Sequence, residues 1–126
     1  MSQWTGDELE RIAAAEEMEL ATARGDGTLR NPVTIWVVRQ GDDLYVRAWR
    51  GRDSPWFRGV QDRHEGQVDA GGVTKHVAFV EVDDEPVNAA IDAAYRAKYH
   101  HYAASIVEPM VAPLARAATI RLDPRD

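Results

Sequence analysis

The stretch that decides the fold is Asn31-Pro32-Val33-Thr34-Ile35-Trp36-Val37-Val38-Arg39. Its β-branched and aromatic residues follow one another without a polar face, which predicts a single strand over 31–39 that is buried on both sides, as in a closed barrel. Short turns flank this strand, with Gly25-Asp26-Gly27 before it and Gln40-Gly41-Asp42-Asp43 after it. Such short connections predict antiparallel neighbours, because parallel strands need long crossovers.

The same pattern continues on both sides of this stretch. A helix is expected over about 6–17, because Thr5 and Glu8 have the spacing of a capping box, and a second helix is expected to begin at Ser54-Pro55. A third helix is expected after Asp83, whereas Pro109 and Pro113 predict irregular chain over 100–113. The remaining segments read as strands, over 18–24, 44–49, 67–70, 73–82 and 117–122. Six strands with these turns predict a mainly β (α+β) fold, an antiparallel barrel with peripheral helices.

Composition excludes several classes of protein. The 126 residues carry 15 Lys and Arg against 21 Asp and Glu, and the net charge of −6 argues against a nucleic-acid binder or an anchor on anionic lipid. The absence of cysteine excludes disulfides, thiolate metal sites and cysteine nucleophiles. The acidic first twenty residues do not resemble a signal peptide. We therefore expect a soluble, cytoplasmic protein with a single domain over residues 1–126.

Positive charge is concentrated in one segment of this acidic chain. Five arginines, Arg47, Arg50, Arg52, Arg58 and Arg63, lie between positions 47 and 63, where only Asp53 and Asp62 oppose them, so the local net charge is +3. Arginine binds phosphate and carboxylate groups in a bidentate manner, and the tryptophans of this segment are suited to stacking on a flat ring. The segment is therefore a candidate anion site. The alternative is that the arginines pair with the chain's own acids and that Trp56 and Phe57 only anchor a helix.

No catalytic motif stands out. The histidines lack metal-ligand spacing, there is no Gly-x-Ser-x-Gly elbow, and there is no glycine-rich phosphate loop. Asp83, Asp84 and Glu85 fit helix capping better than acid–base chemistry. Tyr99, His100 and His101 remain as candidates for a catalytic role, although no reaction is assigned to them.

Three stretches, 30–38, 41–48 and 55–60, resemble the core of the split β-barrel flavin-binding superfamily. The chain is most similar to a bacterial family of unassigned function within it, which also shares the Tyr95-Arg96-Ala97-Lys98-Tyr99 stretch and the tail from Pro109. Neighbouring families are the deazaflavin-dependent nitroreductases and the pyridoxamine-phosphate-oxidase-like proteins. The resemblance implies a six-stranded split barrel that forms a homodimer, with FMN or a deazaflavin bound near the dimer interface.

The resemblance also implies a set of cofactor-binding residues: Arg24, Thr34, Trp36, Arg47, Trp49, Arg50, Gly51, Arg52, Trp56 and Arg58. Trp49 stands where the relatives have a small residue, and Arg58 stands near an expected asparagine. The implied function is a flavin- or deazaflavin-type oxidoreductase acting on a small aromatic or nitro-type substrate. The alternative is a cofactor-free enzyme or a ligand-binding module that uses the same cavity, since a fold does not determine a function. A structural dimer without any ligand is a third interpretation. No metal is expected.

Overall fold

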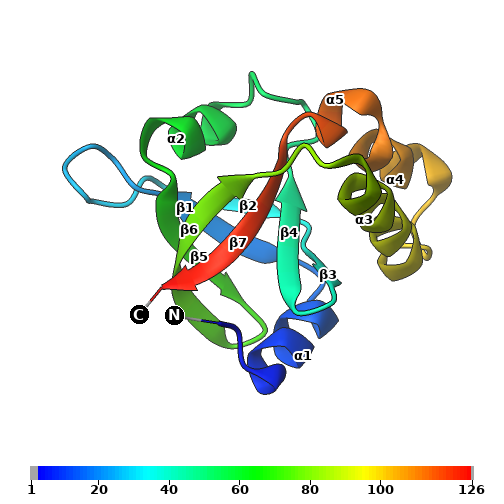
Figure 1. The fold of residues 1–126 in the computed structure, drawn as a ribbon, viewed down its shortest axis with the longest axis horizontal. Helices are drawn as coiled ribbons and strands as arrows, with labels where there is room; N and C mark the ends of the chain where they lie inside the picture. The colour runs from blue at the N-terminus through cyan, green and yellow to red at the C-terminus, as the bar shows by residue number, and fades with distance from the viewer. Residues whose placement is uncertain (1–2, 126) are drawn as a thin grey trace.

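The computed structural model describes residues 3–125 and shows an antiparallel sheet that curls into a barrel (Figure 1). The strands are β1 Met18–Thr22, β2 Val33–Ile35, β3 Val38–Gln40, β4 Asp43–Arg47, β5 Glu65–Ala70, β6 Val73–Glu81 and β7 Thr119–Arg125. The helices are α1 Gly6–Ala14, α2 Pro55–Arg63, α3 Glu85–Lys98, α4 Ala104–Val111 and α5 Pro113–Arg116.

The sheet order is β2-β1-β5-β6-β7-β4-β3, so the two edge strands are consecutive in the chain. The predicted single strand over 31–39 is divided at Trp36-Val37. Ile35 pairs with Met18 of β1 on one edge of the sheet, and Val38 pairs with Tyr45 of β4 on the other. The split barrel is therefore confirmed, but it has seven strands rather than six, because this stretch passes from one edge of the sheet to the other.

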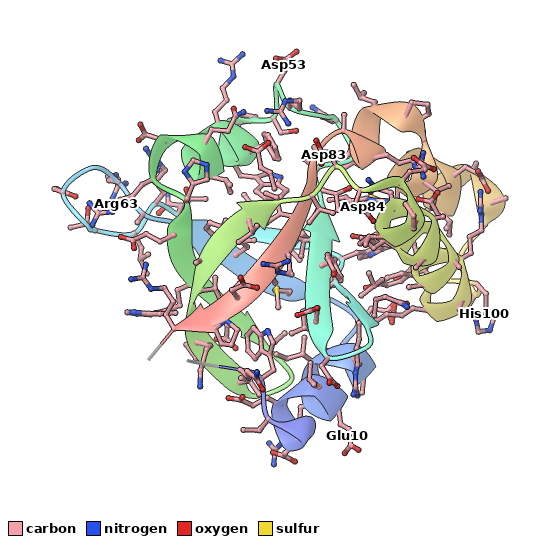
Figure 2. The ribbon with its side chains drawn as sticks, in the orientation of Figure 1. Glu10, Asp53, Arg63, Asp83, Asp84 and His100 are labelled. Atoms are coloured by element: carbon pink, nitrogen blue, oxygen red, sulfur yellow. The ribbon has the colours of Figure 1, made fainter. Side chains whose placement is uncertain are left out.

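The predicted helix starts are confirmed. Side-chain capping accounts for the starts of α1 and α3, whereas at α2 the Ser54 side chain makes no capping hydrogen bond and Pro55 begins the helix. The Thr5 side chain accepts a hydrogen bond from the Glu8 N–H while the Glu8 carboxylate accepts one from the Thr5 N–H, although α1 ends at Ala14 rather than at about 17. Asp84 caps α3 by accepting from the Val87 N–H at 3.2 Å. Asp83 and Asp84 lie at the junction between β6 and α3 (Figure 2), as helix capping requires.

The prediction of irregular chain over 100–113 is wrong for 104–111, which form α4, and α5 begins at Pro113. Pro109 lies inside α4, where it removes the N–H that would otherwise bond to the carbonyl four residues earlier. The helix forms nevertheless because Val107, Met110 and Val111 are buried on the sheet. Tertiary burial here outweighs the loss of one backbone hydrogen bond.

Two hydrophobic clusters lie on the two faces of the sheet. Leu44 and Val46 of β4 belong to the cluster inside the barrel, together with Phe57 of α2. Tyr45 belongs to a second cluster outside it, which α3 and α4 cover with residues such as Ile91 and Val107. Helices α3, α4 and α5 lie together on this side of the barrel (Figure 1). The outward face of β4, which carries Tyr45 and Arg47, is therefore buried.

Candidate functional site

A cavity of about 520 Å³ opens between the edge strand β2 and helix α4. Most of its lining is apolar or aromatic, and it comes from four parts of the chain. The lining residues are Glu17, Val33, Thr34, Ile35, Trp36, Arg47, Trp49, Trp56, Ser105, Ile106, Pro109 and Met110. An apolar pocket with a few polar groups is the usual character of a small-molecule site.

Half of the residues implied by the resemblance meet at this cavity. They are Thr34, Trp36, Arg47, Trp49 and Trp56. Trp49 lies just after β4 and is 53% exposed, so it borders the cavity without filling the barrel. The others, Arg24, Arg50, Gly51, Arg52 and Arg58, are not part of the lining.

Arg47 is held entirely by the protein. Its side chain is 0% exposed, and its five N–H groups all donate to groups of the chain. Nε donates to Thr119 Oγ1 at 2.9 Å. One terminal nitrogen donates to Asp92 Oδ1 at 2.5 Å and to the Met110 carbonyl at 2.9 Å, and the other donates to the carbonyl and the side-chain oxygen of Asn88. Arg47 thus joins β4 to α3, α4 and β7 and has no N–H left to donate to a ligand.

Trp36 is positioned by the end of α3. Its ring stacks on Tyr99 with centroids 3.8 Å apart and planes 5° apart. The buried Tyr99 hydroxyl accepts a hydrogen bond from the Val37 N–H at 3.2 Å and donates to the Glu16 carbonyl at 2.8 Å. Lys98 Nζ donates to the Val37 carbonyl at 2.7 Å. Both the N–H and the carbonyl of Val37 are therefore hydrogen-bonded to side chains near the end of α3, which fixes the Trp36-Val37 link between the edge strands.

Burial shifts the pKa values of Tyr99 and Lys98, the two side chains that bond to the Val37 backbone. Burial is the largest influence on the Tyr99 hydroxyl and raises its pKa, so this group stays protonated and able to donate. Burial of the Lys98 ammonium lowers its pKa to about 8, against the smaller opposing effect of the Glu16 carboxylate. Lys98 therefore loses its proton closer to neutral pH than an exposed lysine does.

The other predicted arginines occupy different surroundings. Arg24 bonds to the Leu29 carbonyl within its own hairpin. Arg52 pairs with Glu81 at 2.7 Å, and Arg58 reaches only the exposed Asp53, at 3.8 Å. The Arg50 guanidinium lies over the Trp49 ring, 4.8 Å from its centroid, and makes no ion pair with any residue of 3–125. Arg50 is thus the free cation adjoining the cavity.

Gly51 has a conformational reason for its identity. Its φ of +86° suits glycine, and a Cβ there would lie 2.6 Å from Leu114 Cδ1 of α5. The glycine therefore lets the turn after β4 pack against α5. This explains the residue without any cofactor.

The candidate catalytic residues lie apart from the cavity lining. Tyr99 is buried behind Trp36, His101 pairs with Glu16 at 3.1 Å, and His100 bonds to the Ala97 carbonyl and points outward at the end of α3 (Figure 2). Over residues 3–125 no group of three or more His, Asp and Glu side chains is arranged to hold a metal ion. Within that range, too, no helix has the length and apolar character that crossing a membrane requires.

The sequence analysis missed seven lining residues: Glu17, Val33, Ile35, Ser105, Ile106, Pro109 and Met110. Val33 and Ile35 flank the predicted Thr34. They could have been identified if the sequence had shown that this stretch forms an edge strand beside the cavity. The four from 105–110 belong to α4, whose existence the proline rule concealed. No pattern in the sequence singles out Glu17.

The family comparison covers most of the chain. Residues 8–122 match the family described as "Uncharacterized protein conserved in bacteria (DUF2255)". No curated protein matches the sequence.

Solved structures share the fold at low identity. A conserved hypothetical protein from Mycobacterium tuberculosis has a TM-score of 0.73 at 12% identity, with 100% of this chain and 83% of that chain covered. A putative pyridoxamine 5'-phosphate oxidase from Listeria innocua has a TM-score of 0.67 at 14% identity, with 94% of this chain and 90% of that chain covered. An F420 reductase has a TM-score of 0.63 at 15% identity, with 93% of this chain and 92% of that chain covered. These likenesses confirm the predicted split-barrel fold.

Proposed function

The chain belongs to the uncharacterised bacterial family DUF2255, and we propose that it is a flavin- or deazaflavin-type oxidoreductase acting on a small aromatic or nitro-type substrate. The observation that carries the proposal is the cavity between β2 and α4, which brings Trp36, Trp49 and Trp56 together. Similar folds are described as an F420 reductase and as a putative pyridoxamine 5'-phosphate oxidase, which supports this class of chemistry.

The residues present fit the ring of such a cofactor. Aromatic and aliphatic side chains offer faces for stacking. Strand β2 is hydrogen-bonded only to β1, so the backbone groups on its outer edge are available to the polar rim of a flavin. When bound, the cofactor would supply hydride transfer, while Trp36 and Thr34 would orient it and the apolar wall of α4 would exclude water.

The anionic tail of the cofactor requires a cation near the cavity. Arg50 meets this requirement, because its guanidinium adjoins Trp49 and makes no ion pair within 3–125. We also propose a homodimer in which a second copy covers the open side of the cavity. Exposed apolar residues support this, since Trp49, Ile106 and Leu114 are each more than half exposed.

The test is a titration of the purified protein with FMN and with F420. Saturable binding of either cofactor is expected, together with a yellow preparation and twice the mass of one chain in light scattering. Arg50→Ala should weaken binding by about 1.5–3 kcal/mol, the range for hydrogen bonds to charged groups. Arg11→Ala, on the exposed face of α1, serves as the matched control and should leave affinity unchanged. A colourless protein that binds neither cofactor would refute the proposal.

A second candidate function is a cofactor-free enzyme or ligand-binding module that uses the same cavity. The buried state of Arg47 favours it, because that guanidinium is fully occupied and contributes no N–H to a phosphate. Under this alternative neither FMN nor F420 binds, but small aromatic compounds still do.

A further inference from the structure

We infer that the cavity between β2 and α4 selects an aromatic ligand that carries a cationic nitrogen over one that carries a carboxylate. The inference names the substrate class of the proposed site and rests on that proposal only for the location of the ligand. It follows from the charges that border the cavity and from its aromatic walls.

Only two charged residues belong to the lining, Glu17 and Arg47. Arg47 forms an ion pair with Asp92, whose other oxygen lies 3.1 Å from Arg116 Nε in a second ion pair. The Arg47 side chain is wholly buried with all its donors used, so it offers a ligand no free N–H, and its charge is offset by the Asp92 carboxylate. Glu17 is therefore the charge of the lining that remains uncompensated.

Glu17 is exposed and makes no ion pair or side-chain hydrogen bond with any residue the structure describes. The preceding residue differs, because the Glu16 carboxylate is engaged by His101 at 3.1 Å. The backbone around Glu17 is also held in place, since the Glu16 carbonyl accepts the Tyr99 hydroxyl and β1 begins at Met18. A free carboxylate on a fixed backbone is a defined partner for a cation.

The walls of the cavity suit the same kind of ligand. Trp36, Trp49 and Trp56 line it, and the face of tryptophan attracts a cation more strongly than that of any other aromatic side chain. The chain already shows this attraction, because Arg50 lies 4.8 Å from the centroid of the Trp49 ring. Arg50 itself lies outside the lining of the cavity, whereas Glu17 belongs to it.

The ligand class follows from these groups. A flat ring fits between aromatic and aliphatic walls, and an amidinium or ammonium group on that ring pairs with the Glu17 carboxylate. A carboxylate on the same ring would face Glu17 with like charge.

The experiment titrates the full chain, without added cofactor, with benzamidine, benzamide and benzoate, three probes of nearly one shape that are cationic, neutral and anionic at pH 7. Calorimetry gives the affinities. The ¹⁵N spectrum gives the location, because the chain has four indole N–H groups. Three belong to the cavity, and the fourth, on Trp4, donates to the Leu122 carbonyl at 2.9 Å and acts as an internal reference.

Benzamidine is expected to bind about tenfold or more tighter than benzoate and to shift the cavity indoles but not that of Trp4. Glu17→Gln should reduce the preference for benzamidine over benzamide to about twofold or less, whereas Glu10→Gln, an exposed position on α1 (Figure 2), should preserve it. Benzoate binding as tightly as benzamidine, an unchanged preference in Glu17→Gln, or no saturable benzamidine binding at millimolar concentration would overturn the inference. Failure of FMN or F420 to bind would refute the cofactor but leave this result standing.

Discussion

Arg47 and Arg50 are three residues apart, yet they have opposite surroundings. Arg47 is the last residue of β4 and lies beneath α3 and α4 with every side-chain N–H bonded. Arg50 lies in the following turn, where its guanidinium lies over the Trp49 ring and makes no ion pair with any residue of 3–125. The difference arises from what covers each residue. The same side chain therefore acts as an internal connector at one position and remains available to ligands at the other.

The largest effect is expected from Arg47→Met. The substitution removes the guanidinium that pairs with Asp92 and bonds to Asn88 and Thr119. Asp92 retains its ion pair with Arg116, but the buried oxygens of Asn88 and Thr119 lose their donor. Removing one partner of a buried ion pair is strongly destabilising, so the free energy of unfolding should fall by about 3–5 kcal/mol. Urea denaturation measures the change. Arg58→Met, at an exposed position, should stay within about 0.5 kcal/mol, and equal effects at the two sites would contradict the contrast.

A smaller effect is expected from Tyr99→Phe. The buried Val37 N–H loses its acceptor, and an unsatisfied buried donor costs about 1–3 kcal/mol. Denaturation monitored by tryptophan fluorescence tests this, and Tyr45→Phe is the control, because its hydroxyl makes no hydrogen bond with residues 3–125. A loss at position 45 as large as that at position 99 would argue against a specific clamp on Val37.

Lys98 should make stability depend on pH. Its pKa in the folded protein is lowered to about 8, below the ordinary value, so the unfolded chain holds the proton more tightly. The contribution of this residue to the free energy of unfolding should therefore rise as pH increases from about 8 toward 10 and stay level below 8. Denaturation of the wild type and of Lys98→Met across this range gives the difference, in which shared tyrosine titrations cancel. A flat difference would show that Lys98 is not desolvated.

The smallest effect on stability is expected from Arg50→Ala. The free energy of unfolding should change by less than about 0.5 kcal/mol, because an exposed cation over an aromatic ring adds little. Thermal denaturation measures this, alongside the cofactor titration described above. A large loss of stability would place Arg50 with Arg47 as a structural residue.

The barrel could be predicted from the sequence because its signals are local. The capping box at Thr5, the glycine turns and the Ser54-Pro55 helix start depend only on neighbouring residues. The burial of Arg47 could not be predicted from neighbouring residues. Its burial requires α4 to cover the outward face of β4, and the rule that proline breaks helices concealed α4. The missed helix thus removed the Met110 carbonyl, one partner of Arg47, and the second wall of the cavity from the prediction. The other partners, Asn88, Asp92 and Thr119, lie on predicted elements, but nothing local in the sequence pairs them with Arg47.

The same reasoning explains which part of the candidate site was foreseen. Trp49 and Trp56 were identified because aromatic residues among arginines are conspicuous in an acidic chain, and Trp36 was identified through the family resemblance. Glu17 was not, since an exposed glutamate is ordinary in sequence and acquires meaning only beside the cavity. Long-range placement, rather than residue type, distinguishes the two cases.

The division of the 31–39 stretch has a consequence for behaviour at high concentration. Each free edge of the sheet, β2 and β3, is only three residues long, and the two-residue link ties both edges to one place. Long, flat edges let chains add to one another strand by strand and grow into aggregates. Edges this short offer such growth almost no template, so the chain should resist aggregation of its folded state even in concentrated solution.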